Sequence, residues 1–215
     1  GVLQYQEIGE NYNPALGFVS RKGVRLKRAQ FVYNTLSADR VVQRSNPGAE
    51  YISWEYLDDN QIQTRLYNIK PIDITSQRGD RLWAMVGRRE ASVRNSNDQP
   101  LRRLGIILPI GHYGWNIAGI GVDTSNRRKL RTISRIMFGD YYQDGRLFDF
   151  SSDTSWRLSK NFNFTFGLNY VDVDLPQGSF ISRLLDFKVD WVFSQQLSLS
   201  NLVQYNNISE SLGFN

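Results

Sequence analysis

The sequence predicts an all-β protein, an antiparallel up-and-down meander of roughly ten long strands that forms part of a transmembrane β-barrel. Apolar and polar residues alternate with a period of two along several runs, as they do in a β-strand. Asn, Asp, Gly and Pro gather between these runs, as they do in turns. No run approaches the roughly eighteen apolar residues of a spanning helix. The mean hydropathy of −0.44 suits a barrel, because half of each strand faces a polar interior.

The N-terminal half of the chain contains four strand-like runs. Residues 51–57 set Ile52 and Trp54 against Ser53 and Glu55. Residues 61–69 form the next run, which also alternates. The two runs after it, 81–87 and 114–122, are apolar on both faces. Short polar segments between such runs predict tight hairpins, the first of them at residues 58–60.

The C-terminal half alternates more regularly. The clearest run is 161–174, in which Phe162 and Phe164 alternate with Asn161 and Asn163. The other runs are 146–158, 184–193 and 197–205, and a second tight hairpin is expected at 159–161. Successive side chains of a strand point to opposite sides, so each run predicts a ribbon with one apolar and one polar face.

The length of these runs indicates that the apolar face contacts lipid and not a protein core. The run from Phe162 to Tyr170 measures about 26 Å along the strand, or about 20 Å of membrane normal at a tilt of about 40°. Strands of a soluble two-sheet sandwich, the alternative, are usually shorter. We therefore expect one set of side chains to face lipid: Phe162, Phe164, Phe166, Leu168, Phe187, Val189, Trp191, Leu197, Leu199 and Val203.

Charged residues within the strands occupy the opposite positions. In a barrel these side chains line the lumen, where water or opposite charges satisfy them. The residues expected there are Asp149, Asp153, Arg157, Asp186, Lys188 and Asp190.

Catalytic and cofactor chemistry finds little support, and the sequence predicts a protein that is not an enzyme. The chain has no cysteine, which excludes thiol nucleophiles, and its one histidine, His112, excludes His-rich metal sites and more than one Ser/His/Asp triad. A lone histidine beside glycines and aromatics is interpreted as a structural or interfacial residue. Asp172 and Asp174 faintly resemble a calcium loop but lack its full set of acidic ligands. No metal and no cofactor are therefore expected. Despite a net charge of +5, the basic clusters fall mostly between strands or at their ends, so nucleic acid is not an expected partner.

Several sequence segments, in their order along the chain, resemble those of a bacterial outer-membrane family of unknown function. They are residues 9–25, 108–131, 138–147, 168–180 and 197–215. Members of that family join an N-terminal family-9-like carbohydrate-binding domain to a C-terminal transmembrane barrel. The resemblance falls wholly within the barrel. It implies that the carbohydrate-binding domain is absent here and that the last strands of the barrel lie beyond Asn215.

These observations predict two segments and one location. Residues 1–22, rich in Gly, Asn and Pro, are expected to form a lead-in at the periplasmic rim or in the lumen, and residues 23–215 the barrel strands. The protein is expected in the outer membrane, with the lipid bilayer as its partner, as a pore, a transporter or an anchor. Glycan would be bound only through the absent domain. The alternatives are a soluble all-β glycan-binding module and a hydrolase that uses carboxylates of neighbouring strands.

Overall fold

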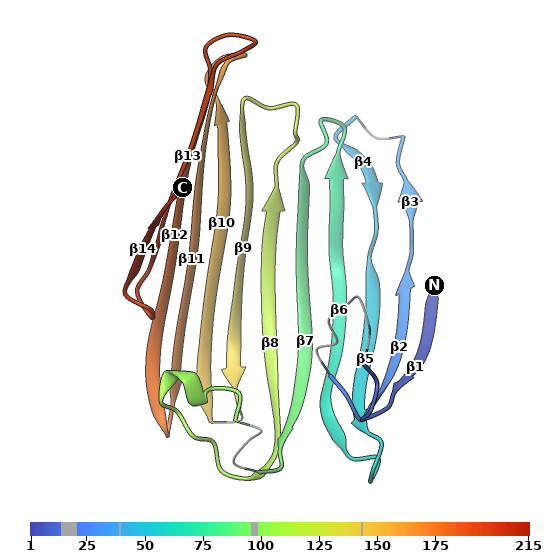
Figure 1. The fold of residues 1–215 in the computed structure, drawn as a ribbon. Helices are drawn as coiled ribbons and strands as arrows, with labels where there is room; N and C mark the ends of the chain where they lie inside the picture. The colour runs from blue at the N-terminus through green and yellow to red at the C-terminus, as the bar shows by residue number, and fades with distance from the viewer. Residues whose placement is uncertain (14–20, 39, 96–98, 143) are drawn as a thin grey trace.

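The protein is all-β. The computed structural model describes residues 1–13, 21–38, 40–95, 99–142 and 144–215 (Figure 1). Within them the strands are β1 Val2–Ile8, β2 Val24–Val32, β3 Thr35–Leu36, β4 Val42–Ser45, β5 Gly48–Tyr56, β6 Ile62–Ser76, β7 Arg81–Val93, β8 Gly111–Asp123, β9 Leu130–Tyr141, β10 Gly145–Arg157, β11 Phe162–Leu175, β12 Gly178–Val192, β13 Ser198–Asn206 and β14 Ser211–Phe214. A short 3-10 helix, η1, covers Arg102–Leu104.

The strands form one antiparallel sheet in which most strands pair with their neighbours in sequence. The order is β1-β2-β5-β6-β7-β8-β9-β10-β11-β12-β13-β14, and the small β3–β4 hairpin joins through the pairing of β4 with β6. This meander confirms the predicted fold class. Ten of the described strands have nine or more residues, in line with the expected number of long strands. The sheet is open, since β1 and β14 stand at its two ends.

The sheet begins earlier than the sequence suggested. Residues 2–8, which were expected to belong to a lead-in segment, form edge strand β1 and pair along their whole length with β2. The boundary at residue 22 is therefore wrong for this part of the segment. The Gly and Pro residues that break the pattern lie after Ile8 and leave this strand intact. Residues 14–20 of the lead-in lie outside the described part of the chain.

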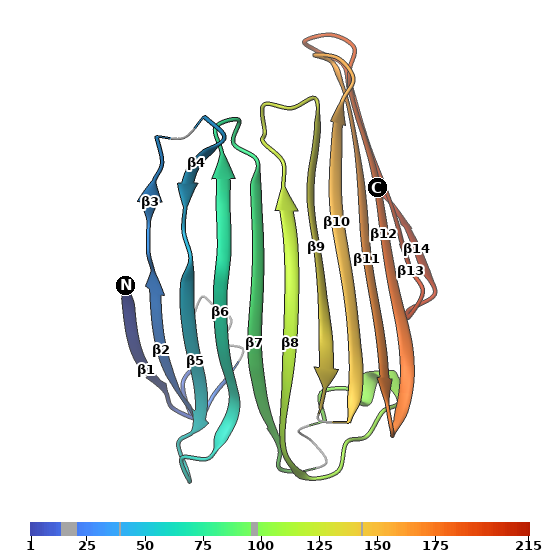
Figure 2. The ribbon, with the colours of Figure 1, turned by 180° about the vertical axis from the view of Figure 1, so that it is seen from behind.

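The sheet curls, and its two faces differ in what covers them (Figures 1 and 2). We call inner the face on which segment 99–110, between β7 and β8, packs, and outer the opposite face. We call lower the end of the sheet where this segment lies in Figure 1, and upper the other end. The buried apolar side chains gather on the inner face at the lower end: Val93, Leu101, Ile106, Leu108, Val173 and Leu175.

Candidate functional site

The strand register places the two predicted sets of side chains on opposite faces of β10 to β13. Phe166 of β11 lies opposite Thr154 on one side and Phe187 on the other, and Val203 follows on β13, all on the outer face. Asp153 and Asp186 flank Gly167 on the inner face. By the same alternation, the side chains expected to face lipid lie on the outer face and the six charged side chains on the inner face.

The outer face carries a band of exposed apolar side chains that crosses the sheet. One row of cross-strand neighbours consists of Ile69, Val86, Ala118, Phe138 and Phe148. The four larger side chains of this row are 42–57% exposed. Soluble monomers rarely expose large apolar side chains in such a contiguous row.

A charged row on the same face ends the band toward the lower end of the sheet. Asp140 of β9 lies opposite Arg146 of β10, and Arg146 lies opposite Asp174 of β11. Asp172 and Asp174 both belong to strand β11 and do not lie in a loop. No group of three or more potential metal ligands occurs among the residues that the structure describes.

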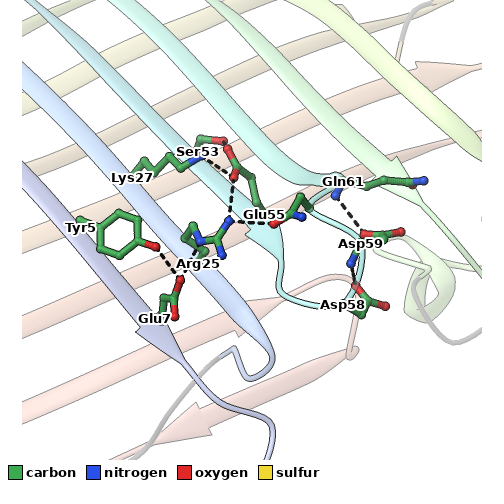
Figure 3. Close-up of polar contacts among 10 residues, drawn as sticks. Tyr5, Glu7, Arg25, Lys27, Ser53, Glu55, Asp58, Asp59 and Gln61 are labelled. Atoms are coloured by element: carbon green, nitrogen blue, oxygen red, sulfur yellow. Dashed lines mark hydrogen bonds and ion pairs between the residues drawn. The ribbon is translucent and has the colours of Figure 1, made fainter.

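Charged side chains continue on the outer face at the lower end of β1, β2 and β5 (Figure 3). The Lys27 ammonium lies 2.6 Å from a carboxylate oxygen of Glu55, whose side chain is 8% exposed. Ser53 donates to the same carboxylate group at 3.1 Å. Arg25 pairs with Glu7 of the edge strand at 2.8 Å and so ties β1 to β2. Because this cluster lies on the outer face, the lower end of that face is polar and not apolar.

The polarity of the two faces is reversed at this lower end. In β5 the apolar Trp54 lies on the inner face, whereas Ser53 and Glu55 lie on the outer face. Higher up, the residues of β10 to β13 that were expected to face lipid lie outside and the six expected to line the lumen lie inside, whereas Arg146, Asp172, Asp174 and Arg183 are charged residues of the outer face. The lower inner face is covered in two places: segment 99–110 packs on the apolar core, and the Arg21 guanidinium lies over the Trp54 ring, 4.9 Å from its centroid.

The inner face above this core is lined by charged and polar side chains that mostly satisfy one another. Lys188 pairs with Asp190 at 3.0 Å, and Asp190 accepts a hydrogen bond from Ser200 at 2.7 Å. Asp186 accepts from Gln204 at 2.7 Å. Arg157, the last residue of β10, donates to the backbone carbonyl of Arg128 at 2.9 Å.

Sequence reasoning missed the basic partner of Asp149. The Arg135 guanidinium of β9 lies 3.7 Å from its carboxylate, on the same face. It also missed an ion-paired group on the inner face, in which Arg81 of β7 bonds Asp73 at 2.7 Å and Asp123 at 3.3 Å. The signal was present in part, because Arg81 opens the run 81–87 and Asp123 directly follows the run 114–122.

Two inner carboxylates converge on one glycine. A Cβ built on Gly167 would lie 3.1 Å from an Asp186 oxygen and 3.2 Å from an Asp153 oxygen. A Cβ at this position would crowd both carboxylates, and each would have to move by a few tenths of an ångström. This pair is the arrangement closest to the hydrolase alternative among the described residues. Its Asp186 member is already engaged by Gln204.

Segment 99–110 closes against the inner face through its own hydrogen bonds. The Gln99 side chain donates to the Leu108 carbonyl and accepts from the Leu108 amide, both at 2.9 Å. Leu108 is 1% exposed. Beside it, Tyr142 stacks on Trp115 with ring centroids 4.6 Å apart, and burial raises the pKa of the Tyr142 hydroxyl, which therefore stays neutral. These rings pack on one another and offer no free aromatic platform for a sugar ring.

No protein-family model, curated protein or solved structure matches the chain. Among the described residues, no helix is long and apolar enough to cross a membrane.

Proposed function

We propose that the chain forms part of the wall of a membrane-spanning β-barrel, which serves as a pore, a transporter or a membrane anchor in a bacterial outer membrane. The observation that carries this proposal is the exposed apolar band on the outer face, with its charged lower limit on the same strands. A soluble sheet would cover such a band or make it polar, because exposing it to water costs about 25 cal/mol per Å². Lipid is the solvent in which such a band is stable.

The inner face supports a polar interior for this barrel. Several of its charges are paired or hydrogen-bonded, Asp149 with Arg135 and Asp186 with Gln204 across neighbouring strands and Lys188 with Asp190 along β12, which is how charges persist inside a membrane protein. At the lower end the interior is filled by segment 99–110 and its apolar core. We propose that this segment narrows the interior and limits the passage of solute.

Reconstitution tests the membrane proposal. The purified chain is mixed with neutral phosphatidylcholine vesicles, which are then floated and washed at alkaline pH to remove peripheral protein. We expect the protein to stay with the vesicles through the wash. A chain that remains soluble and monomeric without detergent refutes the proposal and supports the soluble glycan-binding module.

Conductance tests the role of segment 99–110. The Gln99→Ala substitution removes both side-chain bonds to Leu108 and should loosen the segment, so single-channel conductance or open time in planar bilayers should rise. The matched control is Arg103→Ala, which truncates an exposed side chain of the same segment. Equal conductance of wild type and Gln99→Ala would show that the segment does not limit passage.

A further inference from the structure

We propose that the upper rim of the sheet binds the phosphate groups of anionic lipids at the bilayer surface. The inference rests on the proposed membrane function and adds a lipid class to it. The upper rim consists here of the β8–β9 connection with the start of β9, residues 124–131, and of the end of β10 with the β10–β11 connection, residues 157–161 (Figure 1).

These two segments concentrate positive charge. Together they contain six cationic residues and no Asp or Glu: Arg127, Arg128, Lys129, Arg131, Arg157 and Lys160. The register brings the segments side by side, since Leu130 lies opposite Trp156. Arg157 then ties them together, because its guanidinium donates to the backbone carbonyls of Asn126 and Arg128. The charges are therefore held on one small surface.

Most of this charge has no acidic partner. Asp80 of the β6–β7 connection pairs with Arg128, its Oδ1 lying 2.7 Å from the Arg128 Nε. Among the described residues, no ion pair joins Arg127, Lys129 or Lys160 to a carboxylate, and all three are exposed. The lower end differs, because there Arg94 pairs with both Asp58 and Asp59.

Apolar side chains directly beside the cations identify the ligand as a lipid. Leu130 is 54%, Trp156 46% and Leu158 48% exposed. Leu130 and Trp156 are cross-strand neighbours on the outer face, above the Thr132–Thr154 and Ser134–Ser152 pairs. A surface that joins exposed apolar side chains to unpaired cations matches an acyl chain joined to a phosphate. Nucleic acid or free phosphate would use the cations but would leave Leu130 and Leu158 without a partner.

Lipid quenching of Trp156 tests the proposal. The protein is reconstituted in phosphatidylcholine vesicles that contain brominated phosphatidic acid or, separately, brominated phosphatidylcholine, and Trp156→Phe supplies the background from the other tryptophans. Each cation near an anionic surface strengthens association about fivefold at low salt. We expect wild type to prefer phosphatidic acid at least tenfold, and the triple variant Arg127→Ser, Lys129→Ser, Lys160→Ser to lose most of that preference.

The matched control removes the same charge from the lower end, as Lys22→Ser, Arg103→Ser, Arg146→Ser, and should keep the preference. Equal loss in both triple variants overturns the proposal, because net charge alone would then explain the binding. Displacement of the lipid by millimolar glycerol phosphate, or by an oligonucleotide at equal phosphate concentration, overturns the assignment to a lipid. Insertion without any preference refutes this inference alone, whereas failure to enter neutral vesicles refutes the membrane function and the inference with it.

Discussion

Arginine at Phe166 gives the sharpest test of the outer apolar band. Phe166 stands midway between Phe162 and Tyr170 on the outer face of β11, about 13 Å along the strand from each. At a strand tilt of about 40° it lies about 10 Å from each end of that run along the membrane normal, near the midplane. Its side chain is 38% exposed. In lipid, an Arg there should lower the free energy of unfolding by about 2–4 kcal/mol.

The assay is reversible urea unfolding of the reconstituted protein, followed by tryptophan fluorescence. The control is Asn169→Arg on the same strand, whose side chain lies on the inner face in a pocket shared with Asp153 and Asp186. Two carboxylates nearby should accommodate that cation, and the cost should stay below about 1 kcal/mol. If Phe166→Arg is as mild as a surface substitution, within about 0.5 kcal/mol, the band faces water and the lipid assignment is wrong.

Two further predictions concern the inner face and the upper rim. Gly121→Ala should lower the free energy of unfolding by about 1–3 kcal/mol, because its Cβ would lie 2.3 Å from the rigid Trp83 ring. The control Gly111→Ala, whose Cβ would have no atom closer than 3.9 Å, should lower it less. Equal effects of the two substitutions in a denaturant titration would contradict the close packing of Gly121 on Trp83. Hydrogen bonds from Arg128 and the Ser125 amide lower the pKa of Asp80 to about 2. A carboxyl whose pKa is lower in the folded state contributes stability above its ordinary value of 3.8, and that contribution disappears as the pH falls toward about 2. Stability measured over this window should therefore fall less steeply in Asp80→Asn, and an unchanged slope would contradict the role of this ion pair.

The C-terminal half of the fold could be predicted from sequence because alternation alone decides it. In β11 each Phe is separated from the next by one polar residue, so a single choice of face fixes every side chain from Phe162 to Tyr170. The same parity fixes Asp186 and Lys188 relative to Phe187 on β12. The partition of these strands into two faces therefore followed from the sequence, whereas the solvent that each face meets stays a prediction.

The N-terminal half could not be predicted in the same way. Alternation in 51–57 separates Trp54 from Glu55 but does not say which of them points inward. That choice depends on what covers the inner face there, and the Arg21 guanidinium, which lies over the Trp54 ring, belongs to a segment with no alternation of its own. Strand β1 was missed for a related reason, since a strand of seven residues followed by Gly and Pro gives too short a pattern to stand out.

The outer and the inner face change polarity at the same level along the membrane normal, which agrees with a single position of the sheet in the membrane. On the outer face of β10, Phe148, Phe150, Ser152 and Thr154 lie between Arg146 in the lower charged row and Trp156 beside the upper cations. The Ser152 and Thr154 hydroxyls are satisfied by Ser134 and Thr132 of β9. The ten steps between Arg146 and Trp156 measure about 33 Å along the strand, or about 25 Å of membrane normal at a tilt of about 40°. This is the height of the apolar band of an outer-membrane barrel. Below Arg146 the outer face becomes charged and the inner face becomes apolar, as expected where the wall leaves lipid for water and its interior packs on segment 99–110. A soluble sandwich gives no reason for both faces to change at the same height.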